Sequence, residues 1–365
     1  MSTTVYFDFE TRSTCDIRKT GADVYARHPD TEILCFAYAV NDEEPTLVKR
    51  KNTQLPIRLL PYLNDPDTKW VAHNATFDFL IWNYVARTTW GWPYIDQKFL
   101  HCTMAQCYAM SLPGSLDNAT SVLDIKNKKD SKGSRVMLQL AKPRRVDGDR
   151  ITWWEEKEYP DKFKTLYKYC LQDVKATREL YKTLPKLNQT ERSVWELDFR
   201  INQRGVHLDE FSVHAAKRLV EMEKLRLNER MKVITKGEIT SCSSYTQIMK
   251  WLNDHGLQTK GIAKPDVVTH LRRKDLSDEV RQVLLTRQEA SKASTAKLEA
   301  MLQGLCPDKK MRGLFQYHGA LTGRWAGRRV QLQNLPRPNL SEQEIENVFR
   351  LLKREESQNG ETIFE

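Results

Sequence analysis

The stretch TTVYFDFET at residues 3–11 constrains the fold more than any other part of the chain. Side chains alternate along a strand with period 2, so one face of this stretch is apolar and carries Val5, Phe7 and Phe9. The other face carries two carboxylates, Asp8 and Glu10. Like charges so close repel, and one would be protonated unless a cation lay between them. The pattern therefore predicts a core strand that borders a site for a hard divalent cation.

Strand and helix patterns alternate through the first half of the chain. Strand patterns recur at residues 32–40, 46–50 and 69–74, and helical patterns lie at 77–87, 114–125 and 161–184. Ser115 is the expected N-cap of the second helix. The last helix has an apolar stripe with a 3.6-residue period, which includes Cys170. This order predicts an α/β domain over residues 1–187.

The pattern changes after residue 187. Residues 190–232 are almost entirely helical in pattern, with one break at NQRGVHLD, and polar, charged helices follow. Strand patterns are scarce until LFQYHGALTG at residues 314–323. We therefore expect a second, mostly helical region over residues 188–316 and a third segment over residues 317–365.

The charge balance favours a polyanionic partner. The chain has 58 Lys and Arg against 48 Asp and Glu, a net charge of +10, with 40% apolar residues. These values are typical of a soluble globular protein that binds nucleic acid first and a membrane surface second. The basic run at residues 126–145 is either a solvated face or a nucleic-acid contact made by Lys128, Lys129, Lys132 and Arg135.

Cysteine usage and hydropathy indicate the compartment. The seven cysteines are an odd number and include no C-x-x-C pair. The N-terminus has no signal-peptide pattern, and the longest apolar run, ILCFAYAV, is too short to span a bilayer. We therefore expect reduced thiols, a cytoplasmic location and no membrane partner.

Two further places supply carboxylates for a metal site. Asp78 follows the strand pattern at 69–74 and begins an aromatic-rich helix, where it could also serve only as a helix-terminal charge. Tyr169 and Asp173 are four residues apart on the long helix and therefore share one side of it. By helical geometry both lie at the border of the buried face, where the alternative is an ordinary surface position.

In this order the motifs resemble those of the DEDD exonucleases, a superfamily with a ribonuclease H-like fold, in which helices flank a mixed sheet. DFET resembles the first exonuclease motif, HNATFD the second and YCLQD the third. Lys168 stands five residues before Asp173, where the histidine subclass has histidine, so the resemblance is to the tyrosine subclass.

The resemblance implies a two-metal nuclease. It implies two Mg²⁺ or Mn²⁺ ions, with Asp8 bridging both and with Glu10 and Asp173 completing the site of the ion that holds the nucleophile. Asp78 would support the second ion, largely through water, and Tyr169 would orient the attacking water. Such an enzyme releases nucleoside 5′-monophosphates from DNA 3′ ends.

The expected partner of this site is a single-stranded or frayed DNA 3′ end. A cleft between a helix edge and a strand end admits an unpaired strand and excludes a duplex. Phe77 and Phe79 are expected to stack on the terminal bases, with core packing as the alternative, and Asn74 is expected to contact the strand.

The rest of the chain resembles family A DNA polymerases. Residues 191–209 resemble the link between exonuclease and polymerase, and residues 244–261 and 284–302 resemble the thumb and the helix that leaves it. YHGALTGRWAGRRVQLQNLPRP at 317–338 resembles the T-G-R motif followed by L-Q-N-[IL]-P, in the form of the phage branch. By this resemblance Arg324, Gln333 and Asn334 contact primer–template DNA, whereas Arg328 and Arg329 have no assigned role.

Motifs of the nucleotidyl-transfer site do not follow in the sequence, which contains neither D-[YF]-S-x-x-E nor R-x-x-x-K-x-x-x-[FY]-G nor H-D-E. The chain is therefore expected to be the N-terminal portion of a proofreading DNA polymerase that does not extend primers alone. The remaining palm and fingers would belong to the same longer chain or to a second subunit, in a bacterial or phage-infected cell.

Two other functions fit part of the pattern. A ribonuclease D-like RNA exonuclease shares the first 185 residues' motifs but would not carry T-G-R and L-Q-N-L-P. A non-catalytic DNA-binding half of a split polymerase would not need the complete set of acids.

Overall fold

The computed structural model describes residues 3–126, 131–291, 295–320, 322–335 and 337–358. The chain divides into two compact units, Met1–Leu208 with Gln303–Gln333, and Asp209–Leu302 with Asn334–Glu365. The functional domain boundaries expected at residues 187/188 and 316/317 stay predictions.

The first unit is built on a five-stranded sheet in the order β3-β2-β1-β4-β5. Its strands are β1 (Thr4–Arg12), β2 (Glu32–Val40), β3 (Thr46–Lys49), β4 (Lys69–Ala72) and β5 (Leu100–Cys102). The pairs β1–β2 and β2–β3 are antiparallel, and β1–β4 and β4–β5 are parallel. The sheet is therefore mixed, with the carboxylate-bearing β1 at its centre, as the predicted α/β fold class requires.

The two faces of β1 pack into two different cores, which confirms the alternation read from the sequence. Val5, Phe7 and Phe9 are buried in an aromatic core on one side of the sheet, where Trp70 and Trp82 contact them. On the other side Tyr6 packs into a core formed largely by α8. A register shift interrupts the β1–β2 ladder between Glu10 and Thr11. Such irregularities re-aim neighbouring side chains and are common beside active sites.

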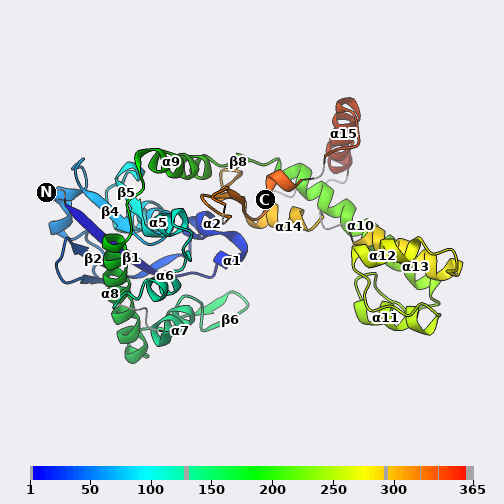
Figure 1. Cartoon of the computed structure of the whole chain (residues 1–365), viewed down its shortest axis with the longest axis horizontal. Helices are drawn as coiled ribbons and strands as arrows, with labels where there is room; N and C mark the ends of the chain where they lie inside the picture. Colours follow the sequence, from blue (N-terminus) through cyan, green and yellow to red (C-terminus); the bar gives the residue numbers. More distant parts are fainter. Residues whose placement is uncertain (1–2, 127–130, 292–294, 321, 336, 359–365) are drawn as a thin grey trace. The chain divides into compact units, whose positions relative to one another are not determined.

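Helices cover both faces of this sheet (Figure 1). The helices of the first unit are α1 (Ile17–Thr20), α2 (Ala22–Arg27), α3 (Ala75–Ile81), α4 (Arg87–Trp90), α5 (Thr103–Ala109), α6 (Leu116–Val122), α7 (Ser131–Leu140), α8 (Pro160–Thr183) and α9 (Gln189–Arg204), and α3 and α8 contact the sheet most directly. A π-helical turn, Trp82–Ala86, joins α3 to α4, and 3₁₀ turns lie at Ile57–Tyr62 and Gln97–Phe99.

Local sequence signals explain where several of these helices begin. The Ser115 side chain accepts a hydrogen bond from the Asn118 backbone N–H, which confirms Ser115 as the N-cap of α6. Pro160 occupies the first turn of α8, where its missing N–H costs nothing. The long helix thus begins one residue before the predicted start and ends at Thr183.

Short strands complete the first unit. A hairpin of β6 (Arg145–Asp147) and β7 (Arg150–Thr152) lies between α7 and α8 in the sequence. β8 (Val206–His207) pairs with β9 (Lys310–Met311), and β10 (Phe315–Gln316) pairs with β11 (Ala326–Gly327). A 3₁₀ turn at Leu332–Asn334 follows.

The second unit is helical, as predicted. Its helices are α10 (Glu210–Ile234), α11 (Tyr245–Asp254), α12 (Lys264–Leu271), α13 (Asp278–Ala290), α14 (Ala296–Gln303) and α15 (Glu342–Gln358). Its core gathers apolar residues between Leu227 and Leu284, with Trp251 among them. Within the described residues of both units, no helix combines the length and apolarity needed to cross a membrane.

Candidate active site

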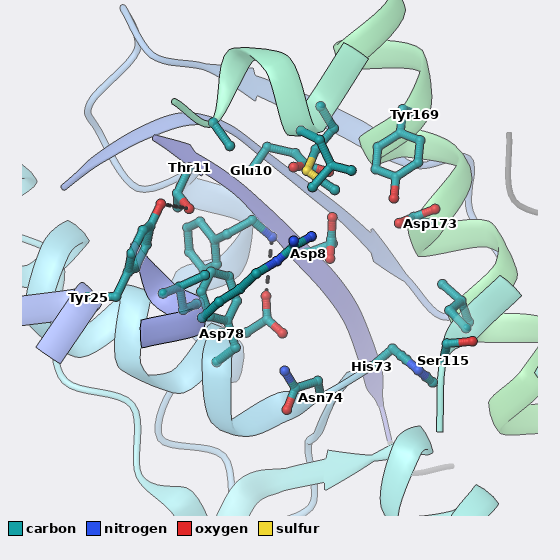
Figure 2. Close-up of a pocket in the computed structure, with 18 of the residues that line it drawn as sticks. Asp8, Glu10, Thr11, Tyr25, His73, Asn74, Asp78, Ser115, Tyr169 and Asp173 are labelled. Carbon is teal, nitrogen blue, oxygen red and sulfur yellow. Dashed lines mark hydrogen bonds between the residues drawn. The ribbon is translucent and has the colours of Figure 1, made fainter. Parts of the chain in front are cut away.

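The predicted catalytic residues line one cavity of about 460 Å³ in the first unit. Asp8 and Glu10 come from β1, Asp78 from α3, and Tyr169 and Asp173 from α8 (Figure 2). Three elements that are far apart in the sequence therefore contribute to a single site.

The central strand presents the first two carboxylates. Asp8 is half-buried and Glu10 is buried, and both are followed by the register shift at Glu10/Thr11. Thr11 then turns to the cavity wall, where its hydroxyl lies 2.9 Å from the Tyr25 hydroxyl. The end of β1 therefore contributes two carboxylates to the cavity, together with a threonine hydroxyl that contacts a tyrosine.

Asp78 is held against β1. It lies in the first turn of α3, is only 1% exposed, and its Oδ1 accepts a hydrogen bond of 3.2 Å from the Phe9 backbone N–H. Burial and the nearby Asp8 carboxylate raise the pKa of Asp78 well above its usual range. Asn74, in the left-handed conformation at φ 67°, makes the turn from β4 into this helix. Asp78 thus does more than balance a helix dipole, because its carboxylate joins α3 to the central strand.

Tyr169 and Asp173 are more buried than the sequence indicated. Helical geometry places them at the border of the apolar stripe of α8, yet they are 1% and 6% exposed. Helix α7 packs against α8 beside Tyr169, and Gly133 permits the close approach. A Cβ atom at Gly133 would lie 2.6 Å from Tyr169 Cδ2. Burial and the surrounding Asp173, Glu10 and Asp8 carboxylates raise the pKa of Tyr169, so its phenol stays protonated.

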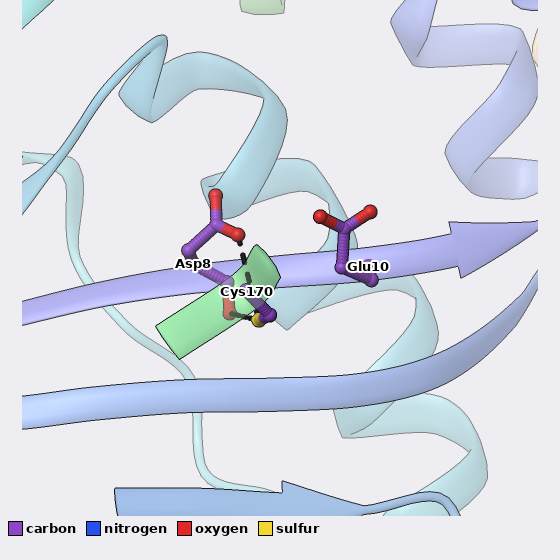
Figure 3. A group of neighbouring side chains, drawn as sticks. All are labelled: Asp8, Glu10 and Cys170. Atoms are coloured by element: carbon purple, nitrogen blue, oxygen red, sulfur yellow. Dashed lines mark hydrogen bonds between the residues drawn. The ribbon is translucent and has the colours of Figure 1, made fainter. Parts of the chain in front are cut away.

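Cys170 is a neighbour of the carboxylates whose role the sequence did not reveal. Its Sγ lies 3.5 Å from Asp8 Oδ2 and 3.7 Å from the Asp8 carbonyl oxygen (Figure 3). Ligand atoms of Asp8, Glu10 and Cys170 lie within 4.8 Å of one another. Burial, Cys35 and the two carboxylates raise the pKa of Cys170, so it is a thiol that donates to Asp8 and not a thiolate ligand.

The donor set fits hard divalent cations. Five carboxylates line the cavity, four of them from β1, α3 and α8 and the fifth from Asp16, and the most buried, Asp78, has lost its hydration. Carboxylate oxygens are the ligands that Mg²⁺ and Mn²⁺ prefer, and cations would relieve the repulsion among them. Cys170 offers only a protonated sulfur, which hard cations do not select.

Of the residues expected to contact DNA near Asp78, two line the cavity and one is buried in the core. Asn74 and Phe77 line the cavity, and the Phe77 ring lies 6.2 Å from that of Tyr25. Phe79 is buried and packs edge-on against Phe199 at 5.0 Å, so the core alternative holds for this residue.

The other residues expected to contact DNA do not line the cavity where the structure describes them. Arg324, Gln333 and Asn334 are exposed, as is Arg135 on α7. Lys128 and Lys129 and the Lys132 side chain lie outside the described residues. Their DNA contacts stay predictions.

Arg328 and Arg329 tie the T-G-R segment to the first unit. Arg328 lines a second cavity of about 200 Å³ with aromatic residues and Asp198. Arg329 Nη2 donates to the Lys19 carbonyl oxygen at 3.2 Å, and its guanidinium packs against Gly21. These arginines therefore have contacts within the unit, which their position in the motif did not indicate.

Comparison with known proteins agrees with this architecture. No family model matches the chain. Over 361 residues the chain is 33% identical to the DNA polymerase of Bacillus phage SP02, in an alignment that covers 96% of this chain and 53% of that polymerase. The chain thus spans about half the length of this curated relative.

A solved structure gives the same result for the fold. The POL domain of Pol1 from M. smegmatis, solved in complex with DNA primer-template and dNTP, matches with a TM-score of 0.54 and 14% identity. The match covers 91% of this chain and 53% of that one. At this identity the likeness shows a polymerase-related fold. Together with the phage relative, it confirms the resemblance to family A-like DNA polymerases over about half of such an enzyme.

Proposed function

We propose that the first unit is a metal-dependent 3′–5′ exonuclease that removes nucleotides from DNA 3′ ends. The observation that carries this proposal is the convergence of four carboxylates and a buried tyrosine from β1, α3 and α8 on one cavity. Such a cluster costs stability in the absence of a counter-charge, so its presence at the centre of a well-packed unit has a chemical reason.

Asp8, Glu10, Asp78 and Asp173 would hold two Mg²⁺ or Mn²⁺ ions. When bound, these ions neutralise the charge that develops on phosphorus-bound oxygens and activate water for an in-line displacement. The hydrogen bond from Phe9 N–H to Asp78 and the thiol of Cys170 beside Asp8 orient two of the four carboxylates before any ion arrives.

The chain's other cavity residues act on the substrate and on water. The raised pKa of Tyr169 keeps its phenol protonated, and because the hydroxyl hydrogen-bonds to Asp173, it would help to orient a water molecule beside that carboxylate. Phe77 and Tyr25 form an aromatic wall against which a terminal base can stack. The side-chain amide of Asn74 lies at the same cavity and is available to the sugar–phosphate chain.

The likeness to DNA polymerases favours DNA over RNA as substrate. The SP02 relative is a DNA polymerase, and the M. smegmatis structure holds primer-template DNA. By this analogy the exonuclease proofreads, and the helical second unit binds primer–template DNA as a thumb. We propose further that nucleotide addition requires the palm and fingers, supplied by the rest of a longer chain or by a second subunit.

The test is digestion of a 5′-labelled single-stranded DNA oligonucleotide and of an RNA of the same sequence. With Mg²⁺ we expect DNA to shorten stepwise from its 3′ end with release of nucleoside 5′-monophosphates, and EDTA to abolish the reaction. Faster digestion of RNA would indicate a ribonuclease D-like enzyme. DNA binding without digestion in Mg²⁺ or Mn²⁺ would indicate a non-catalytic half of a polymerase.

A further inference from the structure

The β6–β7 hairpin has an exposed apolar pair that the fold itself does not use. Val146 and Ile151 are direct cross-strand partners, so their side chains lie on the same face. They are 62% and 38% exposed, and both strands are exposed throughout. Isolated apolar side chains on a surface are ordinary. An apolar pair on a two-stranded hairpin is less ordinary, because a hairpin in water is usually stabilised by packing its apolar side chains against other structure.

The hairpin is fixed at its root to the strand that carries Asp8 and Glu10. Before the hairpin, the Ala141 carbonyl oxygen accepts a hydrogen bond of 3.2 Å from the Ser13 backbone N–H. After it, the Trp154 carbonyl oxygen accepts one of 3.2 Å from Arg12 Nη1. Arg12 is 2% exposed and also pairs with Glu155 at 3.1 Å. Both ends of the hairpin are thus held at the end of the strand that carries Asp8 and Glu10, by its last residue, Arg12, and by the next residue, Ser13.

This root forms part of the cavity wall. Leu138, Ala141 and Lys142 line the same cavity as the carboxylates. The hairpin extends beyond α7 (Figure 1). Gly148, at φ +56°, makes the tight turn at its tip. A nucleic-acid strand that enters the cavity on this side therefore passes along the hairpin.

The charges of the hairpin suit a phosphate chain. Residues 142–152 contain four basic residues, Lys142, Arg144, Arg145 and Arg150, against two acidic ones, Asp147 and Asp149. The Arg144 guanidinium lies 5.6 Å from the Trp154 ring centroid and 5.3 Å from that of Tyr159, which stiffens the base of the hairpin. The end of a DNA duplex presents the faces of the terminal bases at its centre and phosphates at its edge. An apolar pair flanked by arginines is complementary to this surface, because the apolar side chains can pack on the bases and the arginines can bind the phosphates.

We propose that the β6–β7 hairpin separates the strands of a DNA duplex by packing Val146 and Ile151 against the terminal base pair. The inference rests on the exonuclease proposed above and adds the means by which a paired 3′ end reaches a cavity that admits one strand. Packing of the apolar pair on a base face replaces stacking that is lost when the terminal pair opens.

The length of the hairpin predicts when it is needed. Val146 is four positions after Lys142, which lies at the cavity, so the two are at most about 13 Å apart along extended chain. A strand of a duplex advances roughly 3.4 Å per nucleotide and an unpaired strand extends at least as far, so an unpaired tail of about four nucleotides is sufficient to reach the cavity without melting. The effect of the hairpin should therefore be confined to blunt ends and short tails.

The experiment compares wild type, the double variant Val146→Ser with Ile151→Ser, and the control Ile57→Ser. Ile57 is 82% exposed and does not line the cavity. Each protein digests a single strand, a blunt duplex and a duplex with a six-nucleotide 3′ tail. We expect the double variant to digest the blunt duplex about tenfold more slowly and the other two substrates within about twofold of wild type, because tenfold corresponds to part of the cost of unstacking one step. Equal effects on blunt duplex and single strand would overturn the proposal, as would no effect on either.

A second readout needs no catalysis. With EDTA present, wild type and Ile57→Ser should raise the fluorescence of 2-aminopurine in the terminal base pair of a bound duplex, and the double variant should not. An identical rise in all three would also overturn the hairpin's role. If wild type digested no strand at all, the proposed exonuclease would fail, and this fluorescence difference would still decide the question of the hairpin.

Discussion

The two compact units use their carboxylates in opposite ways. In the first unit, Asp8 and Asp78 lie at one cavity, where burial and the Asp8 carboxylate raise the pKa of Asp78. In the second, acids lie in exposed pairs, such as Glu299 with Lys217 at 2.8 Å and Asp275 with Arg273 at 2.6 Å. Exposed pairs contribute little to stability, whereas crowded buried carboxylates reduce it. A destabilising arrangement at the centre of a unit therefore marks where chemistry is expected, and net charge alone does not.

The largest effect should come from removing one of the crowded carboxylates. Asp8→Asn should lower the rate of single-strand digestion by about 10³-fold or more, since it removes a proposed ligand of both ions. Its apo thermal stability should be unchanged or higher, because repulsion with Asp78 is relieved. The matched control is Asp254→Asn on an exposed position of the second unit, which should leave the rate unchanged. A folded Asp8→Asn protein with wild-type activity would refute the assignment of the site.

A substitution in the core of the second unit should have the opposite effect, a loss of stability without a loss of activity. Leu284 is fully buried, whereas its neighbour Leu285 is 39% exposed. Leu284→Ala should destabilise the second unit by about 2–5 kcal/mol, and Leu285→Ala by much less. Neither should alter digestion of a short single strand at a temperature where both units are folded. Loss of this activity in Leu284→Ala alone would show that the second unit is required for the first unit's chemistry.

The pH dependence of stability should differ between a buried and an exposed aspartate. Burial raises the pKa of Asp198 in the first unit to about 6, partly offset by the Tyr317 backbone N–H and the Asn202 amide. Because the folded-state pKa lies above the unfolded value of about 4, the stabilisation by protonated Asp198 is complete below pH 4 and lost as the pH rises to 6. The free energy of unfolding should fall by about 3 kcal/mol over this range through Asp198 alone.

Asp275 has the opposite sign. The Arg273 side chain lowers its pKa to about 2, so its stabilisation is present above pH 4 and is lost as the pH falls. We therefore expect the free energy of unfolding, measured with denaturant between pH 4 and 7, to depend less on pH in Asp198→Asn than in wild type. In Asp275→Asn its dependence on pH should be that of wild type. A wild-type slope in Asp198→Asn would show that this carboxylate is not the group that titrates.

The smallest effect should come from a methyl group placed against Tyr169. A Cβ atom at Gly133 would lie 2.6 Å from Tyr169 Cδ2 and 3.0 Å from its Cβ, so Gly133→Ala must displace the tyrosine or α7. We expect kcat for single-strand digestion to fall about tenfold with KM little changed, while alanine favours the helix itself by up to about 1 kcal/mol. Ser134→Ala, one residue along α7, is the control. An unchanged kcat in Gly133→Ala would mean that the position of Tyr169 is not critical.

Much of the first unit could be predicted from local patterns. The alternation in β1 correctly indicated which side chains enter the aromatic core, and the spacing of α8 correctly indicated its length to within one residue at each end. Both predictions succeeded because the alternation of a strand and the periodicity of a helix are set by residues close together in the sequence. The polymerase resemblance was likewise visible, because T-G-R and L-Q-N-L-P are short and contiguous.

The parts that could not be predicted depend on tertiary packing. The burial of Tyr169 follows from the packing of α7 against α8 at Gly133, which the periodicity of α8 does not reveal. Cys170 belongs to the apolar stripe by spacing, yet its Sγ reaches Asp8 because β1 crosses the helix at that turn. The hairpin's attachment through Arg12 joins residues more than 140 positions apart.

The most direct test of the account is calorimetric titration of the purified chain with Mn²⁺ at neutral pH, in the absence of DNA. The account predicts saturable binding by the wild type and by Asp254→Asn, and at least tenfold weaker binding by Asp8→Asn, because the crowded carboxylates of the first unit are the proposed ligands. Equal binding by Asp8→Asn and wild type would contradict it, since the metal would then be held somewhere other than the cavity between β1, α3 and α8.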